Sequence, residues 1–202
     1  MNKPLLIGSG NRSKARELAE LLVALPWTVQ SLADLPPTPA PEETGQTFEE
    51  NAVLKARYYS NHFGMPCIAD DSGLVVDALD GAPGVHSARY AGDYGNDEKN
   101  NEHLLEALQE VSWHERTARF VCCAVFLAPD GEPHIEHGAV EGHIAMEPFG
   151  DAGFGYDPLF VPVGHSRTFG EMSAEEKHGM SHRGQAIAKL CAFLQGLQAD
   201  KA

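Results

Sequence analysis

The segment Pro4-Leu5-Leu6-Ile7-Gly8-Ser9-Gly10-Asn11-Arg12-Ser13-Lys14 contains a short apolar run, a glycine turn and the start of a helical pattern. From Arg12 to Leu25, apolar residues recur at helical spacing, and Pro26 is expected to end the helix. Free N–H groups at the start of a helix favour a bound phosphate. An ordinary tight turn is the alternative, because the segment fits neither the dinucleotide-binding fingerprint nor the Walker loop. Asn11 and Lys14 favour an anion site.

The rest of the chain mixes helical and strand patterns. Residues 35–41 are too rich in proline for regular structure, and Thr47 with Glu50 has capping-box spacing. The patterns predict helices and strands over the following ranges: helix 48–63, strand 66–69, helix 98–111, strands 117–128 and 133–146 as a hairpin, and helix 181–197. This order predicts an α/β fold with a mixed sheet, in one domain over residues 1–202.

Composition narrows the classes of function. The 202 residues are 43% hydrophobic and 22% charged, which is enough to bury a core. With 15 Lys and Arg against 29 Asp and Glu, the formal net charge is −14. Such a chain repels nucleic acid and anionic membranes. A small anionic substrate is compatible with it where the few cations gather and a divalent ion offsets the acidic background.

The four cysteines and the N-terminus point to a cytoplasmic protein. Cys67, Cys122, Cys123 and Cys191 lack the spacing of a metal or redox motif and are expected to be reduced thiols. Cys122 and Cys123 would point to opposite faces of one strand. No stretch resembles a signal peptide or is long enough to span a bilayer.

Acidic residues follow the predicted strand 66–69. Asp70-Asp71-Ser72-Gly73 stands where α/β sheets collect ligands, and two adjacent carboxylates suit Mg²⁺. The alternative is a turn whose aspartates cap the next segment. Glu42 and Glu43 offer further carboxylates, although a solvated loop is the default interpretation of a short acidic run.

Lys55 falls on the same helical stripe as Ala52 and Tyr59 in the predicted helix 48–63. A lysine on a buried face needs an anion, so we expect its ammonium to reach Asp70 and Asp71 or a substrate phosphate. In the alternative, its stem packs and its head reaches solvent.

Two later segments suit a nucleotide base and an anion. In 153–158, Phe154 and Tyr156 could stack on a heterocycle and Asp157 could bind a base edge, although both aromatics could equally be core residues. Near the last helix, with Ser181 as a candidate N-cap, cations gather that form either a second anion site or a basic surface patch: Lys177, His182 and Arg183. The hairpin histidines are expected at exposed strand positions, not as zinc ligands: His134, His137 and His143.

Six blocks, taken together and in order, resemble the inosine/xanthosine triphosphate pyrophosphatase family over nearly the whole chain. Ser9 stands where that family often has Thr, and the 36–41 loop is richer in proline than usual. The blocks are Ser9-Gly10-Asn11 with Lys14 and Glu17; residues 42–56; Ile68 to Leu74; residues 81–90; Gly153 to Pro158; and Ser181-His182-Arg183-Gly184.

The resemblance implies Mg²⁺-dependent hydrolysis of deaminated purine nucleoside triphosphates (ITP, dITP, XTP) between the α and β phosphates. It also implies an elongated mixed α/β fold with two lobes flanking a nucleotide cleft, and a homodimer. Asp71 would be the catalytic carboxylate near the metal, with Glu43 or Glu42 as the second metal carboxylate. The implied substrate-binding residues are Ser9, Gly10, Asn11, Arg12, Ser13, Lys14, Lys55 and Ser72, then Phe154, Gly155, Tyr156 and Asp157 for the base, and Lys177, His182 and Arg183.

Two other classes of function compete with this expectation. A regulatory or scaffold protein could keep the nucleotide pocket without turnover, and a metal phosphatase would release orthophosphate. Donors placed for a 6-keto oxygen would favour hypoxanthine or xanthine over adenine, with His182 and Arg183 as candidates.

Overall fold

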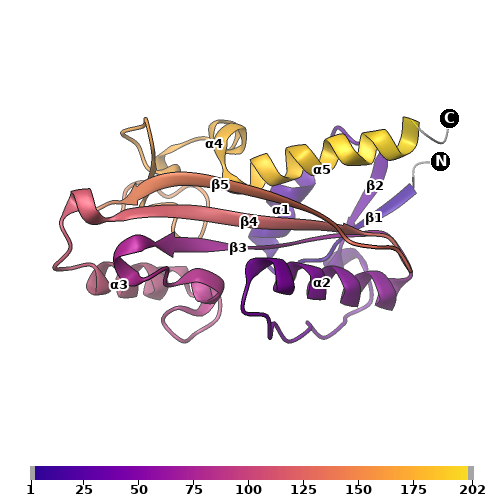
Figure 1. The fold of residues 1–202 in the computed structure, drawn as a ribbon, viewed down its shortest axis with the longest axis horizontal. Helices are drawn as coiled ribbons and strands as arrows, with labels where there is room; N and C mark the ends of the chain where they lie inside the picture. The colour runs from indigo at the N-terminus through magenta and orange to yellow at the C-terminus, as the bar shows by residue number, and fades with distance from the viewer. Residues whose placement is uncertain (1–2, 200–202) are drawn as a thin grey trace. The chain divides into compact units, whose positions relative to one another are not determined.

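The structure is a computed structural model that describes residues 3–199. Six strands form one sheet in the order β2-β1-β3-β4-β5-β6 (Figure 1). β1 is parallel to β2 and to β3, whereas β5 and β6 are antiparallel, so the sheet is mixed, as predicted. The strands are β1 Lys3–Ile7, β2 Trp27–Ser31, β3 Cys67–Val76, β4 Thr117–Leu127, β5 His134–Ile144 and β6 Phe160–Pro162.

The helices confirm most of the predicted pattern. They are α1 Arg12–Leu21, α2 Phe48–Phe63, α3 Asp97–Ala107, α4 Ala174–Met180 and α5 His182–Ala199. Helix α2 has the predicted ends because Thr47 Oγ1 accepts the Glu50 N–H at 3.1 Å and Gly64 adopts a left-handed φ of 63°. The proline-rich 36–41 segment has no regular structure, also as predicted.

Several elements differ from the expectations: α3 ends at Ala107, four residues before the predicted end, and the short strand β6 was not predicted. Helix α1 ends at Leu21, four residues before the predicted end, although Leu25 is still buried in the turn that follows. Strand β2 was not predicted, since it is a short edge strand with no fully buried residue. Helix α4 was not predicted either; it has only seven residues and contains Gly179.

The prediction that a strand ends at Ala69 is wrong. Strand β3 continues through Asp70-Asp71-Ser72-Gly73 to Val76. Asp70 and Asp71 therefore lie inside a ten-residue strand and not in a turn beyond it. Successive side chains of a strand alternate between its faces, so the two carboxylates point in opposite directions.

The chain divides into two compact units, and strands β3, β4 and β5 contribute to both. Unit 1 comprises Met1–Asp71, Cys122–His137 and Arg183–Ala202; unit 2 comprises Ser72–Val121 and Gly138–His182. The single domain predicted from the order of the elements and the central cleft implied by the resemblance stay predictions.

The core of unit 1 is built on both faces of the sheet. Along β4, Cys122, Ala124 and Phe126 pack with α1 and α5, whereas Cys123 and its alternate neighbours pack with α2. This alternation confirms that Cys122 and Cys123 point to opposite faces. Helices α2 and α5 lie on opposite sides of the strands in Figure 1. Along α5, Ile187, Leu190 and Leu194 are buried in this core and Cys191 is partly buried.

Unit 2 has its own core around aromatic side chains. The ring centroids of Phe120 and Phe160 are 4.6 Å apart, and those of Phe160 and Phe169 are 5.3 Å apart. The Arg116 side chain is buried here, where its guanidinium donates to backbone carbonyl oxygens that include that of Leu108 at 2.8 Å. Such bonds compensate a buried cation and tie the end of α3 to the start of β4.

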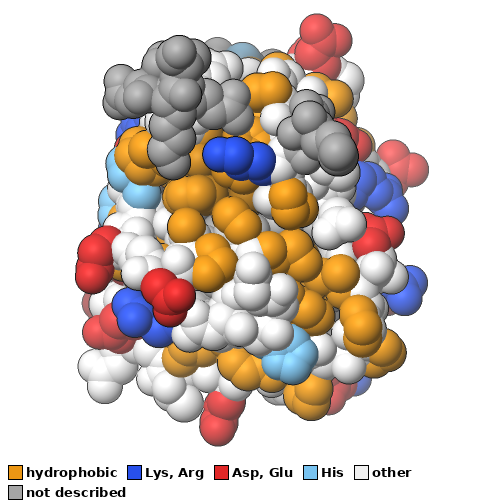
Figure 2. Space-filling view, turned by 90° about the vertical axis from the view of Figure 1, so that its right-hand side faces the viewer, with side chains coloured by type: hydrophobic (Ala, Val, Ile, Leu, Met, Phe, Trp, Pro, Cys, Tyr) orange, Lys and Arg blue, Asp and Glu red, His pale blue; other side chains and the backbone are white. Residues whose placement is uncertain are grey.

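The surface carries both charged and apolar regions. Figure 2 shows a face on which hydrophobic side chains gather at the centre while most acidic and basic side chains lie nearer the margin. Within residues 3–199, every helix is too short or too polar to cross a membrane.

Candidate active site

The glycine turn after β1 is fixed by close packing and by a helix cap. Gly8 donates its N–H to the Ile68 carbonyl at 2.7 Å, and a Cβ at Gly8 would lie only 2.7 Å from the Cys67 Sγ. Asn11 caps α1, because its Oδ1 accepts the N–H groups of Ser13 at 2.9 Å and Lys14 at 3.1 Å. The Asn11 side chain therefore already binds two of the N–H groups that the sequence assigned to a phosphate.

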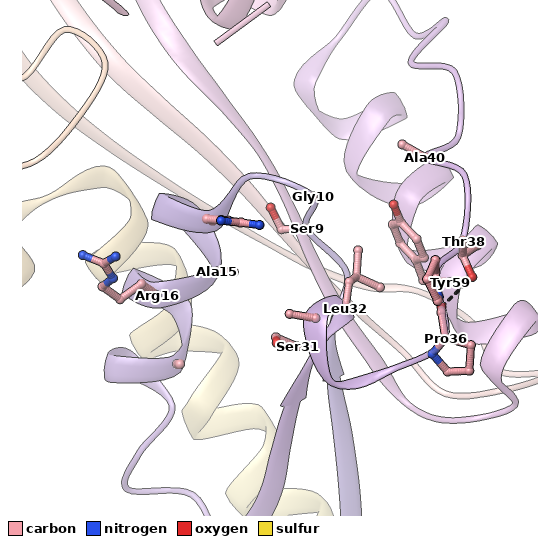
Figure 3. A pocket seen from close by; sticks show the side chains of 14 residues that line it. Ser9, Gly10, Ala15, Arg16, Ser31, Leu32, Pro36, Thr38, Ala40 and Tyr59 are labelled. Atoms are coloured by element: carbon pink, nitrogen blue, oxygen red, sulfur yellow. Dashed lines mark hydrogen bonds between the residues drawn. The ribbon is translucent and has the colours of Figure 1, made fainter.

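A pocket of about 580 Å³ opens beside this turn within unit 1. In Figure 3, Ser9 and Gly10 lie on one side of it, and Tyr59 lies on the other with the proline-rich segment. Arg12 and Arg16 from α1 also line it, so the pocket has cationic groups at its wall. Cationic side chains next to an open turn suit an anionic ligand.

On one face of β3, Asp71 is held by a lysine from α2. Lys55 Nζ lies 2.8 Å from Asp71 Oδ1 and 3.1 Å from Glu43 Oε1. Asn51 Nδ2 is 3.5 Å from Asp71 Oδ2, while the same amide side chain bonds the backbone of Gly45. The expectation that Lys55 reaches the acidic strand is confirmed. Two carboxylates from different segments share its ammonium.

The opposite face of β3 holds Asp70 in a separate charge cluster. Arg183 Nε lies 3.2 Å from Asp70 Oδ2, and Lys14 Nζ lies 3.8 Å from the same oxygen. The Arg183 guanidinium also contacts the Glu17 carboxylate. Both Asp70 and Arg183 are almost wholly buried, so each compensates the charge of the other.

The two clusters adjoin where the β1 pairing stops. The last β1 pair is Ile7 with Ile68, so β3 continues past β1 through Asp70 and Asp71. Lys14 thus contacts the residue next to Asp71, although on the other face of the strand. The adjacent residues Asp70 and Asp71 of β3 therefore contact Lys14, which follows the glycine turn, and Lys55, respectively.

The local charges shift the pKa values of the buried groups. Burial disfavours the ammonium of Lys55, but the carboxylates of Asp71, Asp70 and Glu43 outweigh burial and raise the pKa of Lys55 above its ordinary value. Burial likewise opposes the charge of Arg183, and Asp70 and Glu17 raise its pKa. Lys55 and Arg183 are therefore fully charged at neutral pH.

In unit 2, the 153–157 loop is built around one buried carboxylate. Asp157 Oδ2 accepts the Phe154 N–H at 2.8 Å and lies 2.6 Å from Lys177 Nζ. This ammonium lies 5.0 Å from the centre of the Phe154 ring. The Gly155 N–H donates to Asp97 at 2.7 Å. Asp157 therefore positions Phe154 and Lys177.

Tyr156 does not present the stacking face that the sequence suggested. Its side chain belongs to the core of unit 2, and its hydroxyl donates to the Ser87 carbonyl at 2.9 Å. The core alternative describes Tyr156, whereas Phe154 is only partly buried. Ser72 is half-buried at the start of unit 2, within β3.

The three basic side chains near the last helix do not form an open patch. Lys177, His182 and Arg183 are each at most 4% exposed. Lys177 pairs with Asp157 in unit 2, where the His182 ring stacks on Phe120 with centroids 4.8 Å apart. The Arg183 guanidinium is bound by carboxylates in unit 1, so the predicted second anion site is not present as an exposed cluster.

The residues around Lys55 fit a divalent ion with oxygen ligands. Asp71 and Glu43 contact a single cationic atom and so lie close enough to share one ion, while Glu42 is exposed. The Glu43 side chain is 23% exposed, which leaves room for the waters that Mg²⁺ retains. Between the two candidates for the second metal carboxylate, the geometry favours Glu43.

Sequence reasoning did not find every member of these clusters. Asn51 lies within the block of residues 42–56, but the sequence suggested no role for it or for Arg16. Glu17 was part of the resemblance, but its ion pair with Arg183 joins residues 166 positions apart. Only the spacing of Asn51, one helical turn before Lys55, could have indicated its place on the same face of α2.

The fold is α/β, and the clusters form a charged site. Such a site would suit an anionic ligand whose charge is partly offset by a metal ion. The model of the Ham1 family matches residues 5–193, and the chain belongs to this family. The dITP/XTP pyrophosphatase of Geobacter sulfurreducens is 48% identical over 196 residues, covering 96% of this chain and 98% of the relative. The protein of the same name from Exiguobacterium sp. is 50% identical over 196 residues, covering 95% and 99%.

Solved structures agree with this assignment. A HAM1 protein from Coxiella burnetii has a TM-score of 0.86 at 42% identity, covering 96% of this chain and 99% of that one. The Staphylococcus aureus Ham1 protein has a TM-score of 0.85, also at 42% identity and with the same coverage. The resemblance found in the sequence is confirmed.

Proposed function

We propose that this protein hydrolyses deaminated purine nucleoside triphosphates to the nucleoside monophosphate and pyrophosphate. The names of the curated relatives support a pyrophosphatase that acts on dITP and XTP. The observation that carries the proposal is the group in which Lys55 contacts both Asp71 and Glu43. Two carboxylates close enough to share one divalent ion suit metal-assisted hydrolysis.

The polyphosphate is assigned to unit 1. Lys14, Arg12 and the Ser9-Gly10 turn supply positive charge and backbone groups beside the open pocket. Lys55 adds an ammonium that stays charged because the acidic residues raise its pKa. These groups bind and orient the chain of phosphates, which offsets the repulsion expected from a protein of net charge −14.

Asp71 is assigned the role of the general base that accepts a proton from the attacking water. Lys55 holds its Oδ1, and Asn51 approaches its Oδ2 only at 3.5 Å, so Oδ2 is the oxygen available to accept a proton. Mg²⁺, held by Asp71 and Glu43, would screen the phosphate charge and polarise the scissile bond. The requirement for Mg²⁺ is part of the proposal.

For the base, the sequence points to the 153–157 loop; taken by itself, unit 2 offers the partly exposed ring of Phe154 beside the buried Lys177. The assignment of a 6-keto donor to Arg183 loses support because its guanidinium is bound by Asp70 and Glu17. That His182 donates to this oxygen stays a prediction. A homodimer and a cytoplasmic location also stay predictions; light scattering of the purified protein tests the first.

Product identification tests the proposed function. Purified protein is incubated with dITP and Mg²⁺, and the phosphate products are separated by chromatography. Pyrophosphate is the expected product, and dATP serves as the control substrate that is hydrolysed slowly. Orthophosphate would indicate a phosphatase, and no reaction would indicate a nucleotide-binding protein; either result contradicts the proposal.

A further inference from the structure

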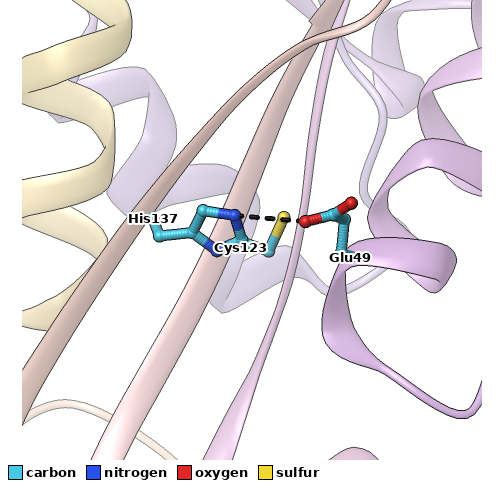
Figure 4. A group of neighbouring side chains, drawn as sticks. All are labelled: Glu49, Cys123 and His137. Atoms are coloured by element: carbon cyan, nitrogen blue, oxygen red, sulfur yellow. Dashed lines mark ion pairs between the residues drawn. The ribbon is translucent and has the colours of Figure 1, made fainter.

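Three further ligand groups, distinct from the carboxylates that contact Lys55, meet on the α2 side of unit 1. Glu49 comes from the first turn of α2, Cys123 from β4 and His137 from β5. Their ligand atoms all lie within 4.8 Å of one another, and His137 Nε2 is 3.2 Å from Glu49 Oε2. In Figure 4, the Cys123 thiol points toward the line that joins these two atoms.

We propose that Glu49, Cys123 and His137 form a Zn²⁺ site, separate from the carboxylates assigned to Mg²⁺. One sulfur, one imidazole nitrogen and one carboxylate oxygen are a suitable ligand set for Zn²⁺, and a water completes the tetrahedron. With ordinary zinc bond lengths, tetrahedral ligand atoms lie about 3.3–3.7 Å apart. The observed group needs only small side-chain movements to reach that geometry.

The burial of the three side chains defines how an ion would enter. Cys123 is 1% exposed, whereas the side chains of His137 and Glu49 are 56% and 52% exposed. An ion therefore arrives from solvent between the imidazole and the carboxylate and meets the thiol beneath them. The Lys189 ammonium donates to the His137 carbonyl at 2.6 Å, which fixes the β5 backbone at this ligand.

The thiol gives up its proton when the metal binds. Burial, followed by the nearby carboxylates of Glu49 and Asp71, raises the pKa of Cys123 to about 12, so the free protein holds a neutral thiol at pH 7. Formation of the zinc–sulfur bond breaks the S–H bond and releases that proton to solvent. The thiolate then neutralises part of the charge of the ion.

The ligand set separates this site from the one proposed for Mg²⁺. Mg²⁺ takes oxygen ligands and has little affinity for sulfur, so excess Mg²⁺ occupies carboxylates without competing for Cys123. The other two hairpin histidines have different neighbours: His134 stacks on Phe193 and His143 on Trp113. The prediction that the hairpin histidines are not zinc ligands is therefore revised for His137 alone.

Zinc binding is measured by equilibrium dialysis of the full chain against Zn²⁺ in excess Mg²⁺. Cobalt is then used in place of zinc, because a thiolate ligand gives Co²⁺ a charge-transfer absorption band in the near ultraviolet. The variants are His137→Ala, at an exposed position, and Cys123→Ser. The matched controls replace residues of the same types elsewhere, His143→Ala and Cys191→Ser.

The wild type is expected to bind a single equivalent of Zn²⁺ and to show the cobalt–thiolate band. Each variant should weaken binding by at least about tenfold, while the controls bind as the wild type does. The proposal is overturned if the wild type binds no Zn²⁺, if His137→Ala leaves the affinity unchanged, or if the band is missing. Should Cys123→Ser fail to fold, His137→Ala and the cobalt spectrum still decide.

Discussion

Asp70 and Asp71 are adjacent in the chain, but their carboxylates lie on opposite faces of β3. Asp70 is buried between Arg183 and Lys14, whereas Asp71 meets Lys55 and approaches Asn51. Removal of the Asp70 charge takes a fully buried carboxylate away from both Lys14 and Arg183 and leaves the buried Arg183 with Glu17 as its other ion-pair partner, which destabilises the fold. Neutralisation of Asp71 leaves less uncompensated charge, because its partner Lys55 also pairs with Glu43.

The two aspartates should therefore differ when each is replaced by asparagine. Asp71→Asn is expected to lower turnover of dITP by about 10²-fold or more with nearly wild-type stability, the scale for loss of a general base. Asp70→Asn should instead lower the free energy of unfolding by about 3 kcal/mol. Urea unfolding and initial rates measure both. Near-normal activity of Asp71→Asn would remove it from the mechanism.

Lys55 gives a second prediction at this scale. Lys55→Met leaves Asp71 and Glu43 without their shared cation, so the variant should unfold at a lower temperature in metal-free buffer. Mg²⁺ should raise its melting temperature more than that of the wild type, because the ion replaces the lost positive charge. Arg119→Met, which breaks an exposed pair with Asp77, is the control. Equal responses of the two variants to Mg²⁺ would count against a metal site at Asp71 and Glu43.

At the scale of elements, the capping-box spacing of Thr47 and Glu50 predicted the start of α2, and the helix ends near the expected position, before a left-handed Gly64. The same logic misplaced the end of β3. Asp-Asp-Ser-Gly is typical of a turn, but here cationic groups on both faces keep the aspartates within a strand. Those cations come from α1, α2 and α5, so no local pattern around Asp70 could have shown them.

The site residues show the same difference between local patterns, which could be predicted, and contacts between distant segments, which could not. The sequence identified Lys55 as a buried-face lysine and placed it with the acidic strand, since helical spacing alone indicated the face. It did not show that Arg183 binds Glu17 or that Tyr156 belongs to the core, because both contacts join distant segments. Short edge elements such as β2 have too few buried residues to give a periodic signal.

The short helix α4 provides a pH-dependent prediction. The Glu176 carboxylate accepts a hydrogen bond from the Arg167 guanidinium at 2.6 Å and another from the Ser173 N–H, which caps the helix. These bonds lower the pKa of Glu176 from 4.5 to about 2. A lowered carboxyl pKa means that the contribution to stability is present above pH 4.5 and is lost as the pH falls toward 2.

Titration of the Glu176 carboxyl by NMR checks this shift. Arg167→Ala should move the midpoint upward, because the bond to Arg167 is the largest cause of the lowered pKa. Arg119→Ala removes an exposed arginine of unit 2 that pairs elsewhere and should leave the Glu176 midpoint unchanged. A midpoint near 4.5 in the wild type would show that the cap and the ion pair do not form in solution.

At the scale of the whole molecule, this acidic protein places several of its cationic side chains where the proposal places the anionic substrate. Lys14, Lys55 and Arg183 all lie in unit 1 around two residues of β3, whereas Lys177 lies beside Phe154 in unit 2. The net charge of −14 disfavours long anionic partners, and because carboxylates already pair with these cations, a bound divalent ion would have to supply further positive charge for a short polyphosphate. These local positive charges within an acidic protein are the physical basis of the proposed reaction.

A single-turnover time course tests the central claim most directly. With enzyme in excess over dITP and with Mg²⁺ present, the amounts of triphosphate, diphosphate, monophosphate, pyrophosphate and orthophosphate are followed together. Cleavage between the α and β phosphates predicts that monophosphate and pyrophosphate appear in equal amounts from the start, with no diphosphate. Diphosphate that forms first, accompanied by orthophosphate, would contradict the account.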